Sequence, residues 1–301
     1  GGPSQPSGAR LPLMVIGNEL GLLDTPVNAC WKSPLTADGP GIQQPDMLLI
    51  GPGERYDVVI DFSNVPANTR LLMWNDAATP YNGQMPDGSN YTAPVPGLQD
   101  RIMAFDVVPR NRLVANATVA IGTPLRPTLG ALPKVNTAGV PARKILMVEG
   151  TDMFGRLQTM LGTVEGGTMV YADPISEKPK AGTTELWEFH NTTGDAHPIH
   201  MHLVDFRVVN RENFTADIDP TKLNSDGSTG ATVIGGARGI HLTGQIYPPL
   251  LHEVGRKDTV VCYPGQITRV LVTFTRAGEY VYHCHILSHE DHEMMRRYKV
   301  I

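Results

Sequence analysis

Residues 267–274 read Ile-Thr-Arg-Val-Leu-Val-Thr-Phe, and this stretch decides the fold class. Val270, Val272 and Phe274 lie on one face of an extended strand, whereas Arg269 lies on the other. Such alternation with a period of two residues is typical of a half-buried β-strand. Three other short runs rich in β-branched and aromatic residues occur at 56–62, 184–189 and 203–209. Because Gly, Pro, Asn and Asp bound these runs, we predict an all-β fold of the Greek-key sandwich or barrel type.

The composition favours a folded chain with many turns. The 301 residues are 41% hydrophobic and 18% charged, which is enough material for buried cores. Gly and Pro are frequent, at 31 and 25 residues, without a collagen-like period. The net charge of −5 gives no electrostatic footprint for nucleic acid or an anionic membrane surface. No run of about 18 apolar residues is available to span a bilayer, and we expect no signal peptide at residues 1–13.

The distribution of Pro, Gly and Arg predicts two β-rich domains and a linker. Residues 1–108 form the first β-rich region, and residues 109–143 form an ordered linker along the surface. Residues 144–301 form a second β domain that contains most of the ten histidines. Within it, residues 212–252 indicate a long Gly- and Asp-rich insertion between strands, and loops of that length are usually functional or disordered. A short turn of helix is expected at 288–293.

Two short motifs contain the candidate metal ligands. The first is His-Pro-Ile-His-Met-His at 197–202. The second is His-Cys-His-Ile-Leu-Ser-His-Glu-Asp-His-Glu-Met-Met at 283–295. Alternate residues of a strand face opposite ways, so His200 and His202 share one face while His197 tends to the other.

The second motif obeys the same alternation, with His283 and His285 on one face and Cys284 on the other. As neighbours in one sheet, the two strands would build two metal sites back to back. One site combines two imidazoles, a thiolate and a weak axial thioether, the ligand set of blue-copper electron-transfer sites. The other is an all-imidazole set suited to copper. The first set is His197, Cys284, His289 and Met294, and the second is His200, His202, His283 and His285.

Taken alone, each of these residues would have an ordinary structural role. A single His-X-His pair is more often a chance feature than a metal site, and a lone cysteine is more often a buried apolar residue. Zinc holds many sets of cysteine and histidine. However, the closed spacing of structural zinc sites, with four cysteines or with two cysteines and two histidines, is absent from this sequence. The coherent alternation in both motifs argues against coincidence.

These motifs resemble the C-terminal copper signature of the multicopper oxidases, His-Pro-X-His-X-His followed by His-Cys-His-X3-His-X4-Met. The sequence at 283–296 is similar to that of the branch that contains bacterial spore-coat laccase, bilirubin oxidase and phenoxazinone synthase. Supporting matches are Gly-Pro-Gly-Glu-Arg-Tyr-Asp-Val-Val-Ile-Asp-Phe at 51–62 and Lys-Asp-Thr-Val…Pro-Gly-Gln-Ile at 257–267. The resemblance covers nearly the whole chain and implies cupredoxin-like Greek-key β-sandwich domains.

The resemblance also implies four copper ions in the complete enzyme: one type 1, one type 2 and a binuclear type 3 pair. By the family pattern, the type 1 ligands are His197, Cys284, His289 and Met294, the type 2 ligand is His200, and the type 3 ligands are His202, His283 and His285. The trinuclear cluster of the family needs further histidines, which an N-terminal portion of the same enzyme would supply as four more ligands. Residues 1–108 would then be the latter part of a middle domain.

As a function, the resemblance implies a laccase-like or phenoxazinone synthase-like oxidase. It would oxidise small phenols or aminophenols by single electrons and reduce dioxygen to water. We expect a partly exposed His197 to receive the electrons, Cys284 to pass them on, and Glu290 to help deliver protons. Two alternatives stay open: a blue-copper electron-transfer or copper-binding protein, because this chain completes only the type 1 site, and a cuprous-ion oxidase. The latter is disfavoured because the 12 methionines are scattered.

A few further residues receive assignments. We expect Asp258 to form a hydrogen bond near the coppers, and His292 to lie on the surface because its spacing from Cys284 does not suit a ligand. Cys30 and Cys262 are expected to be buried or free thiols. The candidates for the substrate entrance near His197 are Tyr247, Pro248 and Pro249.

Overall fold

The computed structural model describes residues 10–32, 43–83, 92–110 and 119–301, and residues 111–118 of the predicted linker lie outside this description. The described residues form two compact units. Unit 1 comprises Gly1–Gly17, Leu22–Leu49 and Tyr56–Ala131. Unit 2 comprises Asn18–Gly21, Ile50–Arg55 and Leu132–Ile301, so two short segments from the first part of the sequence belong to the histidine-rich unit.

Unit 1 consists of small sheets. A three-stranded sheet has the order β2-β1-β5, formed by β1 (Met14–Asn18), β2 (Gly21–Asn28) and β5 (Tyr56–Val59). Two antiparallel pairs complete the described strands of this unit: β3 (Cys30–Lys32) with β4 (Gln43–Pro45), and β6 (Arg70–Trp74) with β7 (Arg101–Asp106). The strand predicted at 56–62 is therefore present as β5.

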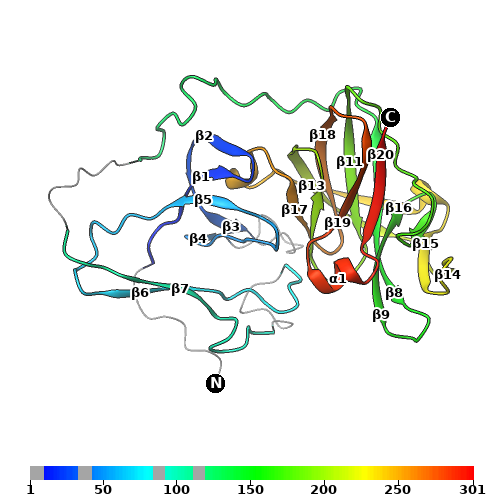
Figure 1. Ribbon diagram of the computed structural model, residues 1–301, viewed down its shortest axis with the longest axis horizontal. Helices are drawn as coiled ribbons and strands as arrows, with labels where there is room; N and C mark the ends of the chain where they lie inside the picture. Colours follow the sequence, from blue (N-terminus) through cyan, green and yellow to red (C-terminus); the bar gives the residue numbers. More distant parts are fainter. Residues whose placement is uncertain (1–9, 33–42, 84–91, 111–118) are drawn as a thin grey trace. The chain divides into compact units, whose positions relative to one another are not determined.

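Unit 2 contains a nine-stranded and a four-stranded sheet (Figure 1). The strands of the larger sheet are β8 (Ala142–Thr151), β9 (Leu157–Thr163), β10 (Gly167–Met169), β11 (Thr183–Asn191), β13 (Phe206–Ala216), β14 (Ile218–Leu223), β15 (Thr229–Val233), β16 (Ile240–Tyr247) and β18 (Gln266–Phe274). Those of the smaller sheet are β12 (His197–Met201), β17 (Thr259–Cys262), β19 (Gly278–Cys284) and β20 (Met295–Val300). The main path of the larger sheet runs β10-β9-β8-β11-β18-β13-β16, and the smaller sheet runs β17-β12-β19-β20.

The core of unit 2 lies between these two sheets. Val270, Val272 and Phe274 of β18 share one buried cluster with Ile199 of β12 and Tyr282 of β19. The face predicted to be apolar at 267–274 is thus the buried face, and the prediction of an all-β sandwich is confirmed. The predicted helix is also present, as α1 (Leu287–Asp291) directly after β19 (Figure 1). Among the described residues, no helix has the length and apolar character needed to cross a membrane.

The insertion at 212–252 is not the long loop that the sequence suggested. Its residues continue β13 and then form β14, β15 and β16, with short 3-10 helices η1 (Gly236–Gly239) and η2 (Leu251–Glu253). The expectation of an irregular segment is therefore wrong, and the physical reason is burial. Ala231 and Val233 of β15 pack against Leu146 and Val148 on the second face of β8. Some of the glycines that suggested a loop stand at turns, as Gly235 does with a φ of 75°, whereas Gly230 and Gly244 lie within β15 and β16.

Candidate metal centre

The two histidine motifs meet on neighbouring strands of the smaller sheet, where residues 197–201 form β12 and the second motif begins with the last two residues of β19. β12 and β19 pair antiparallel, with Ile199 opposite Cys284 and His200 opposite His283. Strand alternation therefore places His200 and His283 on one face of the sheet, and Cys284 on the other with the core cluster. The back-to-back arrangement that the sequence suggested is present.

The first donor group consists of one sulfur and two nitrogen atoms. The Sγ of Cys284 lies 3.7 Å from Nδ1 of His197 and 3.8 Å from Nδ1 of His289, and the two nitrogens are 3.2 Å apart. Met294 is fully buried in the same core cluster as Cys284. The N–H of Cys284 donates to the carbonyl of Met294, and the N–H of Met294 donates to the carbonyl of His289, each at 3.0 Å. These four residues fit the soft ligand set of a blue-copper site.

Burial sets the protonation of this group in the metal-free chain. Burial raises the pKa of the Cys284 thiol to about 12. Burial, assisted by the nearby His289, lowers the pKa of His197 to about 3. The imidazole of His197 is therefore neutral and able to donate a lone pair, whereas the thiol must release its proton when a metal ion binds.

Thr193 fixes the tautomer of His197, a role that no sequence motif indicates. The Oγ1 of Thr193 lies 2.7 Å from Nε2 of His197 and also donates to Oδ1 of Asn191 at 2.8 Å. The hydroxyl hydrogen of Thr193 has two other acceptors, Oδ1 of Asn191 and, at 3.0 Å, the carbonyl of Asp195, so the Thr193 oxygen can accept the proton on Nε2 of His197. The lone pair of Nδ1 is then directed at the sulfur of Cys284.

The expectation of a partly exposed His197 is wrong. Its exposed fraction is 0%, because β12 is an inner strand between β17 and β19 and because Nε2 is bonded to Thr193. His289 lies on α1 after the strand and is only partly buried. Of the two imidazoles in this group, His289 is therefore the one that reaches the surface.

The second donor group consists of imidazoles. Donor atoms of His200, His202 and His283 all lie within 4.8 Å of one another, and Nε2 of His202 is 3.2 Å from Nε2 of His283. Two imidazole nitrogens at that distance must share a proton or a metal ion, so the group fits a metal site. His285 lies beside them, with ring centroids 5.5 Å from His283 and 5.8 Å from His200. Burial, followed by its imidazole neighbours, lowers the pKa of His202, which favours the neutral ligand form.

Hydrogen bonds orient two of these imidazoles. Nδ1 of His200 donates to the carbonyl of Asp258 at 2.9 Å, and Nδ1 of His283 lies 3.1 Å from a carboxylate oxygen of Glu290. Both contacts hold the proton on Nδ1 and leave Nε2 free to bind a metal ion. The predicted contact of Asp258 near the site is thus confirmed. Burial opposes its charge, but hydrogen bonds from His200 and Arg55 hold the pKa of Asp258 well below its usual range.

The remaining assignments have mixed outcomes. His292 is exposed and follows α1, outside both donor groups. Cys30 is partly buried and Cys262 fully buried, and neither forms a disulfide. The hydroxyl of Tyr247 accepts a hydrogen bond from Asn213 at 3.2 Å, and the entrance role of Tyr247 stays a prediction together with those of its neighbours Pro248 and Pro249.

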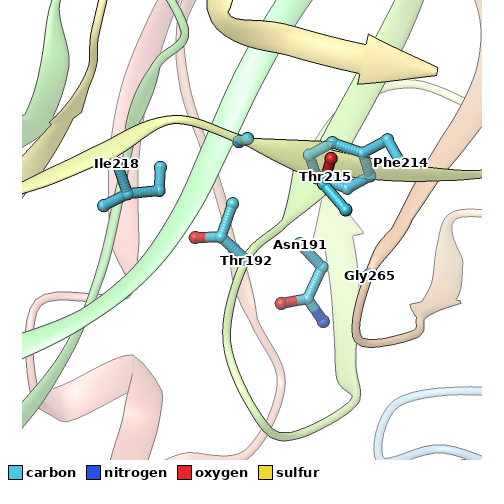
Figure 2. A pocket seen from close by; sticks show the side chains of 7 residues that line it. Asn191, Thr192, Phe214, Thr215, Ile218 and Gly265 are labelled. Carbon is cyan, nitrogen blue, oxygen red and sulfur yellow. The ribbon is translucent and has the colours of Figure 1, made fainter.

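A cavity of about 210 Å³ lies at the end of β11, against residues of the former insertion (Figure 2). Figure 2 shows Ile218 at the left, Phe214 and Thr215 at the upper right, and Thr192 and Asn191 between and below them. None of its lining residues belongs to either donor group, so this cavity is separate from the metal ligands. The full lining is Asn191, Thr192, Phe214, Thr215, Ala216, Ile218 and Gly265.

Comparison with known proteins agrees with this geometry. Residues 148–301 match the multicopper oxidase family. A laccase from Bacillus stratosphericus is 35% identical over 254 residues, which are 84% of this chain and 42% of that laccase. Multicopper oxidase LPR1 of Arabidopsis thaliana is 32% identical over 272 residues, with the same two coverages of 84% and 42%. The chain therefore spans about two-fifths of the length of these relatives.

The fold also matches solved structures. The McoA multicopper oxidase of the hyperthermophile Aquifex aeolicus has a TM-score of 0.60 to this chain at 23% identity. The match covers 98% of this chain and 51% of that protein. The cupredoxin-like sandwich expected from the motifs is accordingly the fold of this chain.

Proposed function

The chain belongs to the multicopper oxidase family, and from this membership we propose that it is the C-terminal part of a laccase-like oxidase. The complete enzyme would oxidise small phenols or aminophenols by single electrons and reduce dioxygen to water. The observation that carries the proposal is the pair of donor groups on the two faces of β12 and β19. Bound copper ions would supply the one-electron redox chemistry at both groups.

The residues divide between the copper sites by donor chemistry. The sulfur-containing group suits a type 1 ion, whereas the imidazole group suits part of a trinuclear cluster. We assign His197, Cys284, His289 and Met294 to the type 1 ion, His200 to the type 2 ion, and His202, His283 and His285 to the type 3 pair. The other four imidazoles of the cluster would come from an N-terminal portion of the same enzyme, which agrees with the two-fifths coverage of the relatives.

Exposure supports His289 as the residue that receives electrons from the substrate. Its imidazole is partly exposed, while His197 is covered and held by Thr193. Cys284 then provides a bonded route, because its peptide bonds lead directly to His283 and His285. A substrate that reaches His289 needs no contact with the imidazole group.

Glu290 is proposed to supply protons for the reduction of dioxygen. Its carboxylate lies 3.1 Å from Nδ1 of His283, and its side chain is 24% exposed. It therefore touches the imidazole group on one side and water on the other. A group in this position can hold a proton at its carboxylate oxygen and exchange it with solvent.

The experiment that tests the proposal is a stoichiometry measurement on the copper-loaded enzyme. Oxidation of an aminophenol should consume one dioxygen for every four electrons removed, and no hydrogen peroxide should accumulate. A second candidate, a blue-copper electron carrier, is favoured by one observation: the type 1 donor group takes all its ligands from this chain. If substrate bleaches the blue colour while dioxygen is not consumed, the carrier function replaces the oxidase.

A further inference from the structure

The segment Ile50–Arg55 belongs to unit 2, although it lies far before the second β domain in the sequence. It carries the Gly-Pro-Gly-Glu-Arg motif at 51–55. Its residues contact the surroundings of two imidazoles, His200 on β12 and His285 directly after β19. The contacts are made by Gly53 on one side and Arg55 on the other.

Gly53 packs directly on the ring of His285. A Cβ atom at this position would lie 2.5 Å from Cδ2 and 2.7 Å from Cγ of His285. The backbone of Gly53 also has a φ of 83°, a conformation that favours glycine. The main chain of this segment therefore forms one wall against the His285 ring, and a larger residue would displace it.

Arg55 links Gly53 to Asp258, the residue that orients His200. Its guanidinium donates to both carboxylate oxygens of Asp258, at 2.9 and 2.8 Å, and Nη1 also donates to the carbonyl of Gly53 at 2.7 Å. The carbonyl of Asp258 accepts the proton of His200 Nδ1. The Oγ1 of Thr259, which donates to Asp258 at 2.9 Å, lies 3.1 Å from the same nitrogen. The planar guanidinium of Arg55 thus binds both Asp258, which orients His200, and Gly53, which packs on His285.

A second ion pair fixes the same two stretches of chain. Lys257 is fully buried, and its Nζ lies 3.1 Å from a carboxylate oxygen of Glu54 and 2.7 Å from one of Glu19. The other oxygen of Glu54 accepts the N–H of Gly51 at 2.8 Å. Residues 54 and 55 are therefore paired with residues 257 and 258, so that the segment cannot shift without separating two ion pairs.

We propose that Arg55 is a positioning residue for the imidazole metal site, acting on His200 through Asp258 and on His285 through Gly53. The proposal rests on the proposed function in that it takes these histidines as copper ligands. Arg55 keeps Nδ1 of His200 protonated and keeps the ring of His285 against the segment, so both rings are oriented before a metal ion binds. Pre-oriented ligands bind with less loss of conformational freedom.

The test removes the guanidinium of Arg55 but keeps an aliphatic side chain of similar length. Arg55→Met should make copper in the imidazole site about tenfold easier to remove with a chelator and should change its electron paramagnetic resonance spectrum. The blue absorption of the type 1 site should be unchanged, because its ligands lie on the other face of the sheet. Arg55→Lys keeps the positive charge but lacks the planar guanidinium, so the ease of copper removal from this variant should lie between those of Arg55→Met and the wild type. Gly53→Ala should weaken the same site through His285.

The matched control is Arg256→Met. Arg256 makes the same two-pronged contact with Asp205, at 2.6 and 2.8 Å, near the surface of the same unit. This variant should bind copper as the wild type does, and its thermal unfolding should match that of Arg55→Met. A general loss of stability would instead weaken both copper sites together.

A measurement on the metal-free chain separates this proposal from the proposed function. Imidazole nitrogen NMR should show His200 protonated at Nδ1 alone in the wild type and a mixture of both tautomers in Arg55→Met. If the spectrum of His200 is the same in both proteins, the positioning role is wrong even when copper binds. If the wild-type tautomer is fixed but the copper-loaded complete enzyme, with its N-terminal portion, holds no ion besides type 1 copper, the proposed function fails and the positioning role stands.

Discussion

Cys284 is the residue at which the two donor groups meet, since its sulfur faces two imidazoles and its peptide bonds lead to His283 and His285. Cys284→Ser replaces the thiolate with a hydroxyl that does not give the intense copper–thiolate absorption. We expect the blue band to disappear, while the imidazole site keeps its copper. Visible spectra and copper analysis measure both effects. The exposed His292→Ala should retain the colour, and a blue Cys284→Ser protein would exclude the type 1 assignment.

Glu290→Gln tests the proton supply. Glutamine can still accept a hydrogen bond from His283, so the orientation of that ring should persist, but the acid is lost. We expect reoxidation of the reduced enzyme by dioxygen to slow by about 10²–10⁴-fold, the usual contribution of general acid–base groups. Anaerobic reduction of the type 1 site by substrate should be unaffected. Stopped-flow traces of the two half-reactions separate them, and Asp291→Asn is the control for an exposed carboxylate. Equal slowing of both half-reactions would assign Glu290 a structural role.

Strand alternation predicted which ligands share a face, because the two-residue period depends only on the local chain. It could not predict the exposure of His197, which depends on the neighbouring strands β17 and β19 and on Thr193. It also missed Arg55, whose partner Asp258 lies 203 residues away in the sequence. Contacts of that kind are set by the packing of distant segments.

At the scale of elements, η2 holds a histidine whose protonation is coupled to folding. Arg211 of β13 donates to both carboxylate oxygens of Glu253, at 2.8 and 2.7 Å, and both Glu253 and His252 of η2 are buried. Next to this pair, burial lowers the pKa of His252 to about 4. In the unfolded chain a histidine titrates near about 6.5. Between about pH 6.5 and 4, His252 is therefore protonated in the unfolded state but neutral in the folded state.

This difference fixes the sign of the pH dependence. The stability that neutral His252 provides is fully present above about pH 6.5 and is lost as the pH falls toward 4, by about 3 kcal/mol in total. His252→Gln does not titrate, so its free energy of unfolding should fall less steeply over this range. Urea unfolding at several pH values, followed by tryptophan fluorescence, measures the slope. The same slope in the wild type and in His252→Gln would contradict the coupling.

The insertion at 212–252 shows why some strands were harder to predict than others. Its Gly and Asp residues are turn formers, and by sequence alone they indicate a loop. The short strands between them are stabilised by burial on the second face of β8, which local composition does not encode. In contrast, β18 was predictable because the residues of its apolar face alternate within the single continuous stretch 267–274.

At the scale of the whole molecule, the copper content should depend on a companion portion. On the proposed assignment, this chain offers all the type 1 donors but only part of an imidazole cluster. We expect the chain alone to bind one type 1 copper firmly, and the chain together with its N-terminal portion to bind four ions. Copper analysis after dialysis compares the two preparations. If this chain alone reduces dioxygen at the rate of the complete enzyme, the need for a companion is refuted.

The substrate class follows from how electrons reach the protein. In the proposed function, the partly exposed imidazole of His289 would accept an electron without covalent chemistry, so the potential and the access of the donor should set the rate. An aminophenol, a methoxyphenol and a non-phenolic mediator should therefore all be oxidised, with rates that follow their potentials. Cuprous ion should react more slowly, because the strands of the former insertion contain no methionine to bind it. Steady-state kinetics on the copper-loaded enzyme compare kcat/KM for each donor. A clear preference for cuprous ion would instead make the protein a metal oxidase, whereas activity on a single phenol would indicate a dedicated binding pocket.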